Sequence, residues 1–278
     1  VFEPESDGRL VDVVVPVARS GRASSTEAAQ PRAFRPGGPP LLVYINREGA
    51  TLTGGSDDAS RNRSSIVRGS ATIPRFRGSD ATWGEIRSCV QDQFARFNVT
   101  VTDARPASGP YLMAMVGGNG SELGYGRGIG GVAPLDSTDC SVIDGAVVYI
   151  FSENLGNNNG EYNCEVIAHE VGHALSLDHE YLASDPMTYL SYNGLQRFQD
   201  VDAACGEYSS RSCACGRPRQ NSVKVLLSQV GPASGEPPPP PPPGQAPEVR
   251  IDSPAEGAVL PADTTLRIVA TATDDVQV

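Results

Sequence analysis

The sequence predicts an α+β or α/β domain built on a mixed, twisted sheet with two main helices. Two observations lead to this expectation. Apolar, β-rich segments alternate with amphipathic helical segments between residues 41 and 177. A run of seven consecutive prolines then separates this part from a β-rich remainder. Most of the chain is therefore expected to form one domain, with a shorter second unit behind the prolines.

The elements are expected in the order β-α-β-β-β-β-α. Runs of apolar and β-branched residues predict the strands, at 41–46, 98–104, 111–118, 128–136 and 145–151. The first helix is expected over 79–97, with Ser79 or Asp80 as its N-cap and Trp83, Ile86 and Val90 at helical spacing. The second helix is expected over 161–177.

The flanks of this domain are less regular. Residues 1–38 are rich in Arg, Ser, Ala and Pro and lack periodicity apart from "LVDVVVPV". They are interpreted as an N-terminal extension, either a pro-segment or a flexible tail. After the second helix, irregular chain is expected to about Val230. The main domain is therefore assigned to 39–230, with an irregular C-terminal subdomain.

The second unit follows a linker assigned to 231–247. Its prolines favour polyproline II, a stiff spacer rising about 3.1 Å per residue. Residues 248–278 alternate like strands and resemble the opening of a bacterial immunoglobulin-like repeat. Such a sandwich needs about seven strands and ~100 residues. We therefore expect an incomplete immunoglobulin-like domain, a partial β-sandwich.

Composition limits the functions and locations to be considered. The formal net charge of −11 argues against a nucleic-acid surface. No apolar run approaches the roughly 18–20 residues of a membrane span. The six cysteines favour disulfides and hence a secreted or cell-surface protein. A cysteine zinc site is the rival interpretation, and the pairing of the cysteines is open. A monomer is expected.

All three histidines of the chain fall in the stretch "HEVGHALSLDH". On a helix, His169 and His173 lie one turn apart on one face, so both imidazoles can bind one metal ion. His179 supplies a third nitrogen if the helix ends soon after His173. Three imidazoles suit Zn²⁺, and Glu170 beside them suits a general base. Histidines that merely happen to share a helix are the alternative, which this clustering disfavours.

These residues resemble the metzincin clan of zinc endopeptidases, whose motif is HExxHxxGxxH followed by a methionine turn. The turn would be "DPMTY", with Met187 as an apolar floor beneath the metal. Tyr189 resembles the tyrosine of the astacin and serralysin branches, which can bind zinc and stabilise the oxyanion; the alternative is a tyrosine packed under the site. The spacing between His179 and Met187 is similar to the corresponding spacing in matrixins. The segments "DPMTY", "FQDVDAACGE" and "QNS" together are similar to secreted metallopeptidases of myxobacteria.

The resemblance implies a secreted, bacterial zinc endopeptidase acting on proteins or peptides. Glu170 would activate a zinc-bound water for attack on the peptide bond. The zinc cleft would lie below an edge strand that binds extended substrate. The strand residues assigned to this role are Gly130, Gly131, Val132 and Ala133.

Ser176 departs from the motif, which has glycine at this position. That glycine adopts a left-handed conformation and redirects the chain toward the third histidine. Serine there would cost of order 1 kcal/mol. We therefore predict a strained or altered turn before His179.

Three further points stay open. A catalytically silent, metal-stabilised surface adhesin is the alternative function, suggested by the spacer and the β-rich tail. Ca²⁺ could bind the Asp-rich stretch 135–145, although a solvated loop is also expected there. The third point is whether the N-terminal extension keeps the enzyme inactive by blocking the zinc. The first 88 residues contain no cysteine that could bind the zinc, whereas an Asp in residues 1–60 could do so.

Overall fold

A computed structural model describes residues 10–17, 38–233, 248–253 and 269–273 of the chain. The chain divides into two compact units, Val1–Ser234 and Gly235–Val278. The Pro-rich segment, together with the rest of the N-terminal extension and the rest of the tail, lies outside the described residues.

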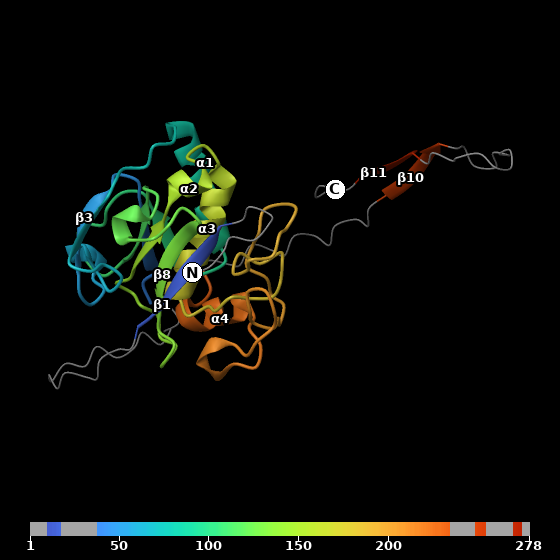
Figure 1. The fold of residues 1–278 in the computed structure, drawn as a ribbon. Helices are drawn as coiled ribbons and strands as arrows, with labels where there is room; N and C mark the ends of the chain where they lie inside the picture. Colours follow the sequence, from blue (N-terminus) through green and yellow to red (C-terminus); the bar gives the residue numbers. More distant parts are fainter. Residues whose placement is uncertain (1–9, 18–37, 234–247, 254–268, 274–278) are drawn as a thin grey trace. The chain divides into compact units, whose positions relative to one another are not determined.

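A six-stranded mixed sheet forms the centre of the first unit (Figure 1). Its spatial order is β1-β8-β9-β7-β2-β6. In that order the strands are Val11–Pro16, Ile129–Leu135, Val147–Ile150, Leu112–Val116, Leu41–Asn46 and Val99–Thr102. β9, β7, β2 and β6 are mutually parallel, whereas β8 is antiparallel to β9. The predicted strands are therefore present, and the α+β class with a mixed sheet is confirmed.

β1 is the unexpected member of this sheet. It comes from the N-terminal extension and pairs with β8 in parallel, with Asp12 opposite Gly131 and Val13 opposite Val132. The strand expected at the edge of the sheet is therefore covered on its outer side. Strand pairing uses backbone groups that any sequence offers, so the mainly apolar "VDVVVP" could not reveal its partner.

A second, three-stranded sheet was not anticipated from the sequence. Its order is β4-β3-β5, and its strands are Arg63–Ser64, Ala50–Gly54 and Ser70–Ile73. These strands have two to five residues each and are rich in Thr and Ser, so they carry little periodic signal.

Two long helices pack against one face of the main sheet and against each other (Figure 1). α1 spans Asp80–Phe94, and Ser79 is its N-cap because its side chain accepts from the amide of Thr82. α3 spans Gly160–Ala174, and a short helix α2, Ser152–Leu155, precedes it.

The chain after α3 is not irregular throughout. It contains a further helix, α4, at Ser222–Val230, which corrects the expectation of irregular chain to Val230. Asn221 caps this helix by accepting from the amide of Lys224, and Val223, Leu226 and Val230 are buried at helical spacing. Both signals are present in the sequence.

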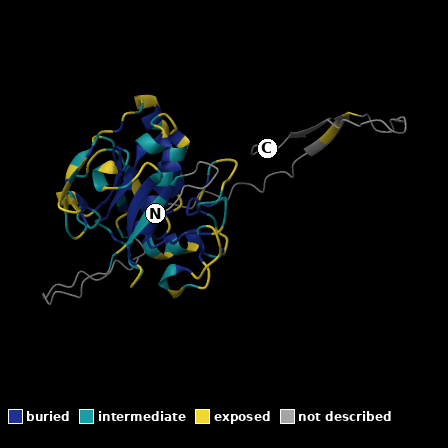
Figure 2. Ribbon diagram, viewed as in Figure 1, coloured by how far each residue is buried: buried dark blue, intermediate teal, exposed yellow. Residues whose placement is uncertain are grey.

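The apolar core is divided between the two faces of the main sheet. Buried residues are concentrated in this sheet and in the helices beside it (Figure 2). Alternation along β2 shows the division, because Val43 and Ile45 belong to the cluster under the helices whereas Tyr44 belongs to the opposite cluster. The helix-side cluster includes Ile167 and Val171 of α3, so the helix that carries two histidines is anchored along its length.

All six cysteines form disulfides, which excludes the rival cysteine zinc site. The pairs are Cys89–Cys164, Cys140–Cys215 and Cys205–Cys213. The first joins α1 to α3. Three disulfides in a chain of this length favour an oxidising, extracellular or secreted environment. In the described ranges, none of the helices combines the length and apolar character that crossing a bilayer requires.

In the second unit the structure describes one antiparallel strand pair. β10, Glu248–Ser253, pairs with β11, Val269–Thr273. The pairing agrees with the predicted strand alternation, and the remaining residues that would define an immunoglobulin-like sandwich lie outside the described part.

Candidate metal site and cleft

α3 ends at Ala174, three residues before the predicted end, and the turn that follows directs the chain to the third histidine. The amide of Ser176 donates to His173 O and that of Leu177 to Gly172 O, each over 2.9 Å. This pair of bonds defines a Schellman turn. Ser176 has φ +76°, in the left-handed region that favours glycine. The predicted strain at this position is confirmed.

The Ser176 side chain has partly buried partners of its own. Its hydroxyl oxygen lies 2.7 Å from Arg217 Nη2 and 3.2 Å from Gln229 Nε2. A glycine could not make these bonds. The serine therefore adopts a less favourable backbone conformation at the turn and gains contacts with α4 and with the segment before it.

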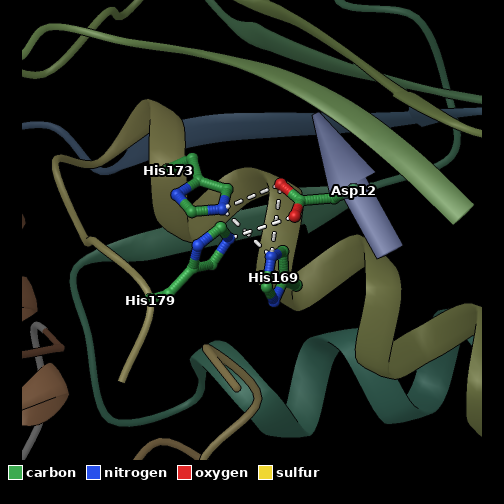
Figure 3. Close-up of side chains that lie close together, drawn as sticks. All are labelled: Asp12, His169, His173 and His179. Carbon is green, nitrogen blue, oxygen red and sulfur yellow. Dashed lines mark hydrogen bonds and ion pairs between the residues drawn. The ribbon is translucent and has the colours of Figure 1, made fainter. Parts of the chain in front are cut away.

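The three histidines converge on one point (Figure 3). His169 and His173 project from α3, and His179 reaches the same point from the chain after the turn. The Nε2 atoms of His169 and His173 are 3.0 Å apart. All three rings are nearly or completely buried.

In two of the rings, the opposite nitrogen faces a backbone acceptor. Nδ1 of His169 lies 2.7 Å from Pro186 O, and Nδ1 of His173 lies 2.8 Å from Leu177 O. These carbonyl oxygens can only accept, so each Nδ1 donates a hydrogen bond and each Nε2 is directed to the centre. Imidazole nitrogens that converge in this way are typical metal ligands.

A fourth group completes the cluster. The carboxylate of Asp12, on β1, lies 3.5 Å from His169 Nε2, 3.2 Å from His173 Nε2 and 3.0 Å from His179 Nε2 (Figure 3). The side chain of Asp12 is only 5% exposed. Burial raises its pKa, but the adjacent histidines outweigh this effect and hold the pKa well below its usual value.

The electrostatics of the cluster favour positive charge at its centre. Burial lowers the pKa of His179, but the carboxylates of Asp12 and Glu207 outweigh it and raise this pKa to about 10. Three imidazole nitrogens and one carboxylate oxygen are also a donor set that suits Zn²⁺. The residues therefore fit a bound metal ion, and a buried Asp/His cluster of this kind can hold one.

Glu170 lies beside the histidines and is completely buried. Neither of its carboxylate oxygens has a hydrogen-bond partner in the part of the chain that the structure describes. Burial and the negative charge of Asp12 raise its pKa well above the usual value. A buried carboxyl group without hydrogen-bond partners is unusual in a folded protein, which makes Glu170 a candidate functional residue.

The Glu170 side chain borders a small cavity, of about 40 Å³, between β1 and α3. Gly131 and Tyr189 also line it. One water needs roughly 10–15 Å³ of such space, so the cavity has room for a few waters but not for a peptide. β1 forms one wall of this cavity, through Val11 and Asp12.

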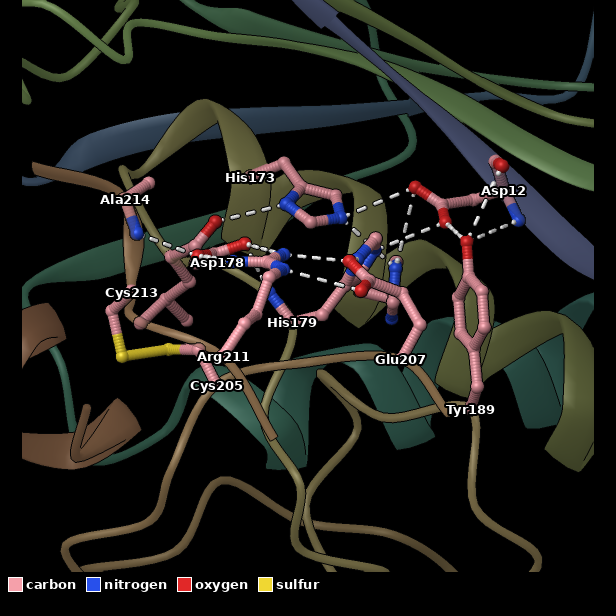
Figure 4. Close-up of polar contacts among 12 residues, drawn as sticks. Asp12, His173, Asp178, His179, Tyr189, Cys205, Glu207, Arg211, Cys213 and Ala214 are labelled. Atoms are coloured by element: carbon pink, nitrogen blue, oxygen red, sulfur yellow. Dashed lines mark hydrogen bonds and ion pairs between the residues drawn. A yellow bond between two sulfur atoms is a disulfide. The ribbon is translucent and has the colours of Figure 1, made fainter. Parts of the chain in front are cut away.

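Met187 packs against α3, and Tyr189 contacts the cluster itself. Met187 is fully buried beneath α3, where a Cβ added to Gly172 would lie 2.5 Å from Met187 Sδ. The Tyr189 hydroxyl donates to the Asp12 carboxylate and accepts from the Asp12 amide at 3.2 Å (Figure 4). Its ring lies 4.7 Å from that of His179.

The structure thus brings together the histidines, the glutamate, the methionine and the tyrosine expected from the sequence motif. Of the residues assigned to the substrate strand, Gly130 and Gly131 line the cavity. Two participants were not identified from the sequence, Asp12 and Glu207. Asp12 carried a signal, since it is the one charged residue in an otherwise apolar strand segment, "VDVVVP". Glu207 carried none, because nothing local relates it to His179.

The Asp-rich stretch 135–145 does not contribute to a metal-ligand group within the described ranges. Asp136 instead stabilises a turn by accepting from the amides of Thr138 and Asp139. A search with the whole chain found no matching protein-family model and no matching curated protein.

Proposed function

We propose that this chain is a zinc-dependent endopeptidase of the metzincin type, secreted and acting on protein or peptide substrates. The observation that carries the proposal is the convergence of three histidine Nε2 atoms beside the unpartnered carboxyl group of Glu170. A structural metal site has no need for such a group.

His169, His173 and His179 would hold the metal. Zinc bound there would supply a Lewis acid that polarises the scissile carbonyl and lowers the pKa of water. Glu170 then accepts the proton of the attacking water and delivers it to the leaving amine. Tyr189 donates a hydrogen bond to the oxyanion once its hydroxyl is released from Asp12.

The described conformation is, on this proposal, the closed form. β1 lies along β8 where an extended substrate would add as a strand. Asp12 lies beside the three histidines, where its carboxylate would compete with the water that a catalytic metal needs. Activity therefore requires that β1 leave the cleft.

The test compares metal binding and cleavage in the full chain. Purified protein should contain one zinc per chain by mass spectrometry, and the Asp12→Ala variant should cleave unfolded casein. Adding Glu170→Gln should abolish the cleavage and leave the zinc content unchanged. Cleavage by the double variant at the rate of Asp12→Ala alone would overturn the proposed role of Glu170.

The closed arrangement also favours a second candidate, a catalytically silent, metal-stabilised surface adhesin. Four protein groups around one centre are typical of a structural zinc site. The candidates differ in one outcome. The adhesin predicts zinc binding with no cleavage of a broad peptide library by Asp12→Ala, whereas the peptidase predicts cleavage that Glu170→Gln removes.

A further inference from the structure

His179 is held differently from the other two histidines. It lies outside α3, and its Nδ1 faces a side chain, Glu207, whose Oε1 is 2.7 Å away. The other two Nδ1 atoms face backbone carbonyls. The orientation of the third ring therefore depends on a residue 28 positions later in the chain.

Glu207 belongs to a short loop closed by the Cys205–Cys213 disulfide. This loop docks on the backbone around His179. The amide of Gly206 donates to His179 O over 3.1 Å, and the amide of Tyr181 donates to Ala204 O over 2.8 Å. The Glu207 carboxylate is thus carried on a covalently closed support that is fixed to the ligand it contacts.

Arg211, in the same loop, connects the carboxylates of Glu207 and Asp178 (Figure 4). Its two terminal nitrogens bind Asp178 over 2.6 and 2.8 Å, and Nη2 also binds Glu207 Oε1 over 2.6 Å. Asp178 in turn accepts from the backbone amides of His179 and Ala214. The imidazole, both carboxylates and the guanidinium form one continuous hydrogen-bonded network.

The same acidic groups could be considered a second metal site, because Asp178, His179 and Glu207 offer ligand atoms close together. The Arg211 guanidinium already fills the space between the two carboxylates. Its positive charge would repel a metal cation there. Glu207 therefore serves the ring rather than a second ion.

We propose that Glu207 is a positioning residue for the metal centre: by accepting from Nδ1–H of His179, it fixes the ring so that Nε2 faces the metal. Arg211 and the disulfide-closed loop hold the carboxylate in place. Such carboxylate–histidine–metal arrangements typically contribute 10- to 100-fold in metal affinity. The inference rests on the proposed metal site and adds a residue that lies outside the sequence motif.

The experiment measures the zinc dissociation constant of the full chain by competition with a chelator of known affinity. We expect Glu207→Ala to weaken zinc binding about 10- to 100-fold. Glu207→Gln keeps an oxygen acceptor and should rescue part of this loss. Glu48→Ala is the control, because Glu48 is an exposed carboxylate that pairs with Arg47 and Arg75 away from the site.

A second readout separates positioning from a merely structural role. The absorption spectrum of the Co²⁺-substituted chain should change in Glu207→Ala and be closer to wild type in Glu207→Gln. If the variants bind zinc as wild type does, with an unchanged Co²⁺ spectrum, the inference is wrong even where thermal stability falls. If Glu207→Ala does not fold, the zinc affinity and Co²⁺ spectrum of Glu207→Gln are compared with those of the wild type, and that comparison decides. Failure of the wild-type chain to bind zinc would instead overturn the proposed function.

Discussion

The carboxyl group of Glu170 lies in the space left by the missing side chain of Gly131: a Cβ at Gly131 would be 2.6 Å from Glu170 Cδ. The glycine on β8 therefore permits the close approach of strand and helix that brings Glu170 to the cleft. This relationship explains why a strand in a buried sheet has no side chain at this position.

Gly131→Ala should consequently displace Glu170 and slow peptide cleavage, by about 100-fold if the carboxyl group moves ~1 Å. Zinc affinity should be unchanged, because the histidines lie on other segments. The test measures kcat/KM and zinc affinity for Gly131→Ala, in a chain that also carries Asp12→Ala. Gly128→Ala is the control, since a Cβ there meets nothing within 4 Å. Equal rates for the two alanine variants would contradict the prediction.

Removing the Asp12 carboxylate should activate the chain. Losing one partner of a buried charged contact costs about 3–5 kcal/mol, which would shift the population toward the open cleft by about 100-fold or more. We expect Asp12→Ala to cleave peptides faster than wild type, with Asp12→Asn between them because the amide keeps the shape but loses the charge. The test is the initial rate on a fluorogenic peptide library. A zinc-loaded Asp12→Ala variant as inactive as wild type would refute this role.

Ser176 should be less replaceable by alanine than by glycine. Alanine keeps the left-handed backbone strain and loses both partly buried hydrogen bonds, which predicts a destabilisation of about 1–3 kcal/mol. Glycine loses the same bonds but relieves about 1 kcal/mol of strain. Ser176→Gly should therefore be about 1 kcal/mol more stable than Ser176→Ala in urea unfolding. If Ser176→Ala were instead the more stable variant, the left-handed backbone at φ +76° would not destabilise the folded chain.

Zinc should stabilise the folded chain. Binding to the folded state alone adds about 4 kcal/mol at a free zinc concentration roughly 1,000-fold above the dissociation constant. We expect the melting temperature in differential scanning calorimetry to rise with zinc and to fall again with a chelator. His173→Ala should abolish the effect, and Asp12→Ala should reduce it. A melting temperature independent of zinc in the wild-type chain would argue against the metal site.

Local patterns in the sequence determined much of this protein. The spacing of His169 and His173 fixes both rings on one helix face, because the helix repeat is a local property. Local periodicity likewise predicted the main strands and α1, and the even cysteine count indicated disulfides. The motif also singled out Ser176 as a strained position, which the positive φ confirms.

Only the tertiary structure decided which distant segments meet. Asp12 contacts Tyr189 across 177 positions, and Glu207 contacts His179 across 28. Backbone strand pairing is generic, so an apolar strand such as β1 does not specify its neighbour, and ion pairs between loops leave no periodic trace. The motif thus identified the ligands of the proposed metal, whereas packing placed Asp12 and Glu207 beside them.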